Sequence, residues 1–202
     1  MLEGLDRIDW GKLSHAYGEA TDVPAQLRSL ISADPDSFRE TISTLHGNIW
    51  HQGTVYSATA AAVPFLYELL ISPEISCKTD LAEILTSIAD GVGYLEVHAL
   101  GEYGETVWRG ILAEQGKTLE EELELERQVT LSVRKAVSEG LPHLLPYLKS
   151  SDAGFRRALV IALENYPEQA ALILPALDVL EASEKDQEVR AAILETKTRL
   201  IC

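Results

Sequence analysis

The sequence predicts an all-α fold, a solenoid of antiparallel helix pairs stacked along one axis, and three observations support this prediction. Residues 54–89 align without a gap on residues 132–167, at a constant shift of 78 positions. Short helix-start patterns recur at spacings of 33 and 34 residues near the C-terminus. Apolar residues make up 46% of the chain, and many are Ala and Leu, which cost little in a helix. Because one helix pair cannot bury its own apolar face, such pairs stack on one another.

The N-terminal part of the chain, residues 1–53, is predicted to be an irregular helical cap. A short helix is expected over Asp9–Gly18 and a second over Val23–Ser32. Asp34 followed by Pro35 matches an N-cap with proline at the first helical position, so a third helix begins there. The residues on its expected buried face are Phe38, Ile42, Leu45 and Ile49.

The duplicated segments define two repeat blocks, residues 54–90 and residues 132–202. Within the second block, separate helices are expected to begin at Val133 and at Leu141. The positions that agree in type and place between the two copies are Val55/Val133, Ala58/Ala136, Pro64/Pro142, Leu66/Leu144, Leu70/Leu148, Leu81/Leu159 and Leu85/Leu163.

Helix boundaries inside the blocks have local physical causes. Asp152 and Asp186 each stand three residues before an aligned apolar position, where a carboxylate can cap the N–H groups of a first turn. Pro167 ends a helix near Tyr166, because proline disfavours helical geometry in the residue before it. The prolines inside apolar runs should each start or kink a helix. These are Pro64, Pro142 and Pro175.

Residues 91–131 interrupt the repeat as an acidic insertion. The first part, GVGYLEVHALGEYGE, contains four glycines and is predicted to be a loop or a loosely held short helix. Thr118 and Glu121 form a capping-box pattern that opens a helix running toward Val133. The insertion carries nine glutamates against three basic residues, a net charge of −6. Such a charge run is either a solvated helix face or an acidic surface for a basic partner.

Composition and charge narrow the range of partners. The formal net charge is −15, and since affinity for nucleic acid depends on Lys and Arg, the charge argues against that partner. No apolar run approaches the ~20 residues of a membrane helix, so no membrane partner is expected. The first ten residues lack the pattern of a signal peptide. Cys77 and Cys202 lie far apart and match no metal-ligand spacing, so a reducing, cytoplasmic setting is predicted.

The connection between the cap and the repeat holds the candidate binding residues, which the second copy does not reproduce as a set. These are His46, Trp50, His51, Gln52, Thr54 and Tyr56. Several of them precede an apolar helix, whose first N–H groups favour an anion or a carboxylate. The alternative interpretation is structural, with local hydrogen bonds fixing the connection and Thr54 or Ser57 as the N-cap. No Asp, Glu or Cys neighbours the two histidines, so no metal site is predicted.

The alternating motifs resemble those of HEAT-repeat proteins, which are armadillo-type stacks of antiparallel helix pairs. The segments that carry the resemblance are Val133–Leu144, Phe155–Leu163, Pro175–Leu177 and Val189–Ile193. The first copy departs from the pattern because Tyr56 stands where Arg134 stands in the second. The resemblance implies that neighbouring repeats are tied through carboxylates by Arg134, Arg156 and Arg190. The segment of residues 51–60 is similar to one in bacterial HEAT-like proteins, some of which resemble immunity partners of toxins.

The function predicted from these features is a non-catalytic protein-binding module, of immunity or scaffold type, which presents its concave face to a protein partner. A basic partner would be steered by the acidic surface, and its affinity would fall as salt rises. The alternative is a small-ligand-binding protein or an enzyme with a site at residues 51–56, and a weaker alternative is a nucleic-acid-processing HEAT-like protein. No glycine-rich phosphate loop, nucleophile elbow or zinc-protease motif occurs, so no catalytic residue and no cofactor is predicted.

Overall fold

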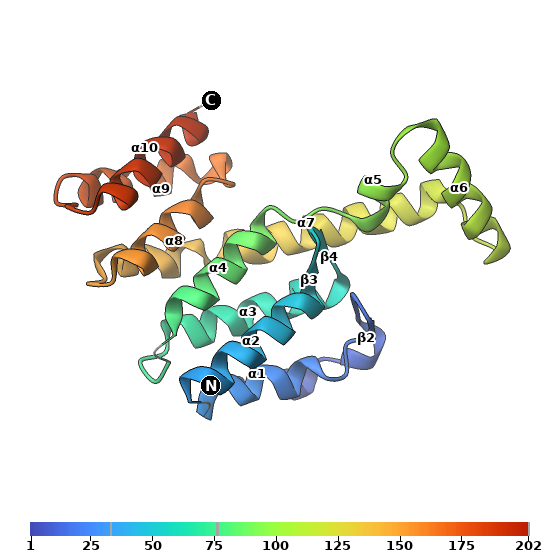
Figure 1. Ribbon diagram of the computed structural model, residues 1–202, viewed down its shortest axis with the longest axis horizontal. Helices are drawn as coiled ribbons and strands as arrows, with labels where there is room; N and C mark the ends of the chain where they lie inside the picture. The colour runs from blue at the N-terminus through green and yellow to red at the C-terminus, as the bar shows by residue number, and fades with distance from the viewer. Residues whose placement is uncertain (33, 76, 202) are drawn as a thin grey trace.

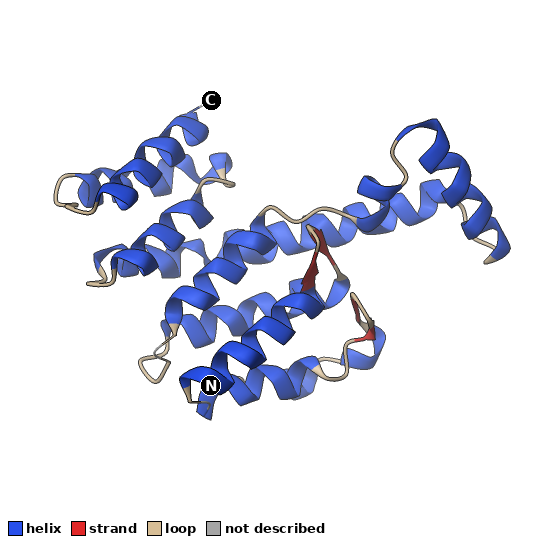
Figure 2. Ribbon diagram, in the orientation of Figure 1, coloured by secondary structure: helices blue, strands red, loops and turns tan. Residues whose placement is uncertain are grey.

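The computed structural model of the chain describes residues 1–32, 34–75 and 77–201, and Cys202 lies outside them. Over these residues the chain folds into ten α-helices and two short antiparallel strand pairs, which confirms the all-α prediction (Figures 1 and 2). The helices are α1 Val23–Ser32, α2 Pro35–Ile49, α3 Ser57–Ile71, α4 Lys78–Ala89, α5 Tyr94–His98, α6 Gly101–Glu114, α7 Leu119–Leu144, α8 Ala153–Leu163, α9 Ala170–Glu181 and α10 Gln187–Ile201. The shorter elements are β1 Ser14–His15, β2 Gly18–Glu19, β3 Trp50–His51 and β4 Thr54–Val55, with the 3-10 turns η1 Leu5–Arg7, η2 Trp10–Lys12, η3 Leu145–Lys149 and η4 Pro167–Gln169.

The two copies of the internal repeat lie against each other. Helix α3 of the first copy packs against α7, and α4 packs against α8. The array continues at one end, where α8 contacts α10 and α9 contacts both α10 and η3. At the other end α1 contacts α2 and α3. The duplicated segments therefore occupy neighbouring places in one array of packed helices (Figure 1).

One apolar core runs through this array, and a second, smaller cluster lies apart from it. The large core includes fully buried side chains such as Leu27, Leu66 and Leu85. The small cluster consists of Leu95, Ala99, Leu112 and Leu119, with Trp108 and Leu123 packed against it. It joins α5, α6 and the first part of α7 into a projecting unit, which we call the arm (residues 94–126; Figure 1). No helix of the described residues is long and apolar enough to cross a bilayer.

Several helix starts follow the predicted capping chemistry. The side chains of Asp34, Thr118, Asp152 and Asp186 accept hydrogen bonds from first-turn amides at 3.1–3.3 Å. Pro35 is the first residue of α2. A carboxylate or hydroxyl at this position satisfies N–H groups that have no partner inside the helix. These local predictions are confirmed, as is the extent of α1.

The predicted break between the insertion and the second block is absent. Helix α7 runs unbroken from Leu119 to Leu144, so the expected helix starts at Val133 and Leu141 are wrong. Pro142 lies inside this helix, as Pro64 and Pro175 lie inside α3 and α9. An interior proline removes one backbone hydrogen bond. Burial of several apolar side chains on the same helix offsets that cost, since each contributes about 1.5–3 kcal/mol.

The helix predicted over Asp9–Gly18 is also wrong. Only the turn η2 forms there, and the chain then enters the β1–β2 pair. Gly18 has a φ of +129°, which lies outside the helical region, and the Nδ1 atom of His15 accepts a hydrogen bond from the Tyr17 amide. These two local features favour a tight reversal of the chain over a helix.

Candidate functional site

The predicted site residues lie on and beside a β-hairpin with a two-residue turn. Strand Trp50–His51 pairs with Thr54–Val55, so Gln52 and Gly53 form the turn. Both residues have a positive φ, +51° and +90°. Turns of this kind match the twist of the paired strands. The hairpin turn therefore requires glycine at position 53. It also holds Gln52 at a positive φ, which costs conformational free energy for a residue with a Cβ atom.

Replacing Gln52 by asparagine should raise the free energy of unfolding by about 0.5–1 kcal/mol, because asparagine tolerates a positive φ better. Urea denaturation of Gln52→Asn beside the parent protein measures the change. Gly53→Ala is the control of opposite sign, since alanine is strained at a φ of +90°. A Gln52→Asn protein that is less stable than its parent would mean that the glutamine side chain contributes a contact of its own.

One face of the hairpin gathers His51, Thr54 and Tyr56. The Thr54 hydroxyl donates to the His51 carbonyl at 2.7 Å, and its oxygen lies 2.7 Å from the Tyr56 hydroxyl. The Nδ1 atom of His51 lies 3.3 Å from the hydroxyl of Tyr17, on the β1–β2 turn. Burial raises the pKa of Tyr56, so this phenol stays protonated near neutral pH. The group is a set of hydrogen-bond donors and acceptors that fixes the hairpin.

The start of α3 is capped differently from the prediction. The N-cap residue is Tyr56, and the hydroxyl oxygen of Thr59 accepts a hydrogen bond from its amide at 2.9 Å. The Thr59 hydroxyl donates to the Ile49 carbonyl at 2.5 Å. Thr54 instead bonds within the hairpin, and Ser57 accepts a hydrogen bond from the Ser14 amide. A buried threonine therefore ties the end of α2 to the start of α3.

His46 and Trp50 form a separate pair. Their rings stack with centroids 4.9 Å apart. Within the described residues, neither the Nε2 atom of His46 nor the Nε1 atom of Trp50 has a hydrogen-bond partner, although both are buried. Burial lowers the pKa of His46, which favours the neutral ring. Trp50 also borders a hollow of about 250 Å³, whose other lining residues are Thr86, Ser87, Asp90, Glu164, Asn165 and Arg199.

The structure therefore divides the six candidate residues. His51, Thr54 and Tyr56 lie together, Gln52 lies at the turn, and Trp50 stacks on His46. Trp50 and His51 are separated because successive side chains of a strand point to opposite faces. No group of three or more His, Cys, Asp and Glu side chains in the described part of the chain is placed to hold a metal ion. The candidates do not converge on one ligand.

The start of the insertion was predicted to be a loop or a loosely held short helix, and this is wrong for α6. Two glycines of this segment, Gly101 and Gly104, allow α5 and α6 to lie close together. Gly101 has a φ of +72°, which allows the chain to turn between α5 and α6. A Cβ atom at Gly104 would lie 3.0 Å from the His98 carbonyl oxygen, so glycine permits the close approach of the two helices. From α7, Glu126 accepts a hydrogen bond from the Leu95 amide at 2.8 Å, which anchors α5.

One face of α6 is apolar and exposed, and we call its four large side chains the α6 stripe. Leu100 and Tyr103 are 71% and 84% exposed, and Val107 and Ile111 are also exposed. Spacings of three and four residues place them on one side of the helix. A neighbouring side of α6, with Trp108 and Leu112, packs into the small core of the arm. Contiguous apolar patches of this kind mark interaction sites on soluble proteins.

An unpaired carboxylate lies at the end of the α6 stripe. Glu114 follows Ile111 by three residues and is exposed, and it forms no ion pair with any residue that the structure describes. Glu102 is also exposed and has no ion pair with a described residue, but it lies on another side of the helix. The cation of this helix, Arg109, lies 2.6 Å from Glu120 and is therefore neutralised. This surface was not predicted from the sequence, because the glycines at the start of the insertion indicate a loop. The spacing of Leu100, Tyr103, Val107 and Ile111 was the signal that could have found it.

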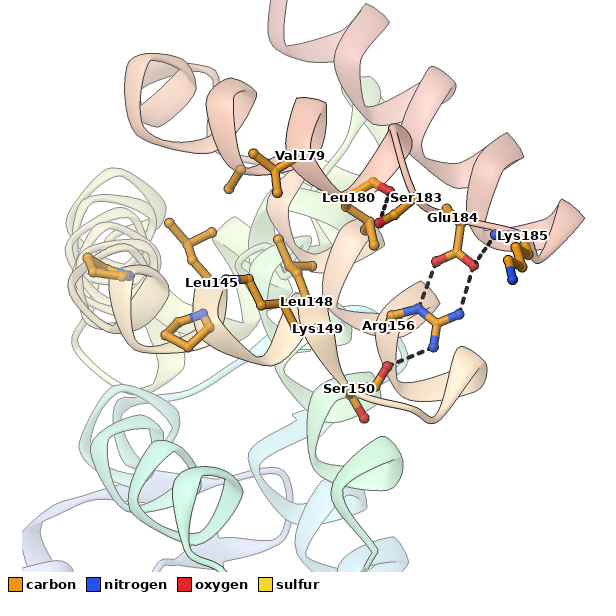
Figure 3. Close-up of a pocket in the computed structure, with 13 residues that line it drawn as sticks. Leu145, Leu148, Lys149, Ser150, Arg156, Val179, Leu180, Ser183, Glu184 and Lys185 are labelled. Carbon is orange, nitrogen blue, oxygen red and sulfur yellow. Dashed lines mark hydrogen bonds and ion pairs between the residues drawn. The ribbon is translucent and has the colours of Figure 1, made fainter.

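A second surface feature is a groove between η3 and α9, with a volume of about 790 Å³ (Figure 3). Its apolar walls are formed by Leu145, Pro146 and Leu148 from η3 and by Ala176, Val179 and Leu180 from α9. Two lysines at its edge, Lys149 and Lys185, form no ion pair with a described residue. A neighbouring hollow of about 470 Å³ shares Lys149 and adds Lys78, whose ammonium lies 4.9 Å from the centre of the Tyr147 ring.

A buried ion pair closes one end of this groove. The Nε and Nη2 atoms of Arg156 donate to the two carboxylate oxygens of Glu184 at 2.7 and 2.8 Å, and Nη1 donates to the Ser150 carbonyl (Figure 3). The same carboxylate accepts hydrogen bonds from the backbone amides of residues 185 and 186. Hydrogen bonding to Arg156 lowers the pKa of Glu184 to about 2. The pair joins the start of α8 to the α9–α10 loop, as expected for an arginine that ties repeats.

The other two arginines of the predicted set differ. Arg134 donates to Glu168 at 2.8 Å and to the Asn165 carbonyl at 2.7 Å, which confirms the tie for this residue. It lies in the middle of α7 rather than at a helix start. Arg190 is exposed and forms no ion pair with the residues that the structure describes, so the predicted tie is wrong there.

Comparison with known proteins does not assign the chain to a family. No protein-family model matches the sequence, and the search of curated proteins gives no match. Among solved structures, the chain is similar to an engineered protein determined by the Northeast Structural Genomics Consortium, at 19% sequence identity and a TM-score of 0.35. The match covers 91% of this chain and 48% of that chain, so the protein spans about half the length of that structure.

Proposed function

We propose that the protein is a non-catalytic protein-binding module, in which a HEAT-like solenoid body carries a projecting docking arm. The body accounts for the internal repeat, whose two copies pack helix on helix. From the sequence alone, the concave face of the solenoid is the expected interface. The α6 stripe now has more support, because it exposes four large apolar side chains on a helix whose neighbouring side is already packed. This single observation carries the proposal.

The chemistry of the stripe indicates the kind of surface it binds. An apolar centre with a charged border is the usual arrangement of a protein interface. Since the stripe ends at the unpaired Glu114 and lies within an insertion of net charge −6, the partner surface should be an apolar depression edged by Lys or Arg. We propose that the partner presents a basic surface, and that the chain acts as an immunity-type or scaffold protein in the cytoplasm.

The alternatives have less support. A small-ligand or enzymatic site at residues 51–56 would need its side chains to converge, whereas Gln52 lies at a turn and the hydroxyls of Thr54 and Tyr56 bond each other. Nucleic-acid processing is disfavoured by the net charge of −15 and by the charge of −6 on the insertion.

Replacing Val107 by aspartate should abolish capture of the partner, because it places an unpaired charge in the centre of an apolar contact. The tagged parent protein and Val107→Asp would be compared in an extract of cells that express the protein natively. Leu194→Asp is the matched control, since Leu194 is an exposed leucine of α10, far from the arm. We expect the parent and Leu194→Asp to retain the same partner, which binds through a surface edged by cations, and to retain it less tightly at high salt. Retention of that protein by Val107→Asp as well would overturn the proposal.

A further inference from the structure

The α6 stripe requires a partner surface that is apolar and edged by cations, and this chain carries such a surface itself. The groove between η3 and α9 has apolar walls that include Leu145 and Val179 (Figure 3). Lys149 and Lys185 stand at its edge without ion-pair partners among the described residues. Arg156 and Glu184, which also line the groove, neutralise each other. The groove is therefore apolar, like the stripe, and the charges at its edge are opposite in sign to those of the arm.

The stripe and the groove cannot meet within one molecule. Figure 1 shows α6 at one end of the molecule, with α9 at the opposite end. Helix α7 holds the arm in this place, since it carries the small core at its start and belongs to the large core at its end. A contact between the two surfaces must therefore form between two molecules.

We propose that the α6 stripe of one copy docks into the η3–α9 groove of a second copy. This inference rests on the proposed function, and it names the partner of the arm as the chain itself. An amphipathic helix lying in an apolar groove is an established mode of recognition. Leu100, Tyr103, Val107 and Ile111 supply the apolar face, and the groove volume of about 790 Å³ lies within the range of clefts that hold ligands.

Charge selects this groove over other faces of a second copy. Each chain has a net charge of −15, so two copies repel each other over most of their surfaces. At the groove, the cations Lys149 and Lys185 can approach Glu114 at the end of the stripe, within the acidic insertion. The contact joins two different surfaces, so it is heterologous. Such contacts close into rings or continue into chains, and the average mass should grow with concentration.

Two single variants and their mixture test the contact by analytical ultracentrifugation. Val107→Asp damages the stripe and Val179→Asp damages the groove. Both residues are exposed, so both variants should keep the parent's circular dichroism and melting temperature. Each variant alone should associate at least tenfold more weakly than the parent, whereas Leu194→Asp should associate as the parent does. The mixture should form a one-to-one dimer, because Val107→Asp retains an intact groove and Val179→Asp retains an intact stripe.

Charge reversal provides a second measurement. Lys149→Glu with Lys185→Glu should weaken association at least tenfold, and addition of Glu114→Lys to the same chain should restore part of it. The inference is overturned if the parent remains monomeric up to about 1 mM, if the aspartate variants associate as the parent does, or if their mixture forms no dimer. A monomeric parent that still loses its partner through Val107→Asp would overturn this inference and leave the proposed function standing.

Discussion

Replacing Glu184 by alanine is expected to lower the free energy of unfolding by about 3–5 kcal/mol, because it leaves the guanidinium of Arg156 buried without a counter-charge. The side chains of the pair are only 13% and 3% exposed. The loss also leaves the amides of residues 185 and 186 without their acceptor, since both donate hydrogen bonds to this carboxylate. Urea denaturation at pH 7 measures the change. Glu139→Ala, which breaks the exposed pair with Lys135, should cost less than about 1 kcal/mol.

The same pair gives the stability a defined dependence on pH. In the folded protein the pKa of Glu184 is about 2, below its ordinary value of 4.5, so the folded state favours the carboxylate. Its contribution is therefore fully present above about pH 4.5 and is lost as the pH falls toward 2. The difference in stability between the parent and Glu184→Ala should shrink over this window. A difference that stays constant from pH 7 to pH 3 would show that the carboxylate does not act through its charge.

Replacing Gly140 by valine is expected to lower the free energy of unfolding by about 3 kcal/mol, because a side chain there would overlap the ring of Tyr67. Gly140 lies in α7 where that helix packs against α3, and Tyr67 is 5% exposed. The ring cannot move without loss of the 2.8 Å hydrogen bond from the Tyr67 hydroxyl to the Val137 carbonyl. Chemical denaturation of Gly140→Val measures the cost.

Two comparisons separate this clash from the general effect of changing a helical glycine. Gly47 lies inside α2 and has open space around its missing Cβ, so Gly47→Ala should stabilise the protein by about 0.5–1 kcal/mol. Tyr67→Ala combined with Gly140→Val should cost less than the sum of the two single changes, since the ring is no longer present to clash. Strict additivity of the two changes would refute the proposed overlap.

The features predicted correctly from the sequence are those with a local cause. Asp34, Asp152 and Asp186 cap helices because each carboxylate reaches amides two or three residues away. The internal alignment pairs α3 with the end of α7 and α4 with α8, and the structure shows that the helices of each pair pack against each other. Such signals are visible in a single sequence, since they depend on spacing alone.

The errors arose where distant contacts override local preference. The glycine-rich start of the insertion indicated a loop, but Gly104 permits two helices to approach each other, and this requirement is visible only in the fold. In the same way, burial along α7 outweighs the break that Pro142 suggested. At the candidate site, the sequence did not indicate the hairpin turn that Gln52 and Gly53 form, because the positive φ of Gln52 depends on the pairing of the two strands.

The unbroken α7 has a geometric consequence for the arm. With 26 residues it is about 39 Å long, and it is continuous from the small core into the large one. The direction in which the stripe faces therefore depends on the number of residues in α7 between the two cores, because each residue rotates the helix by a fixed angle. One residue gained or lost between Glu126 and Val133 would rotate the arm by about 100°, whereas seven would return it to nearly its original heading and shift it by about 10 Å. Relatives of this chain that keep the same contact should differ in length here by whole heptads.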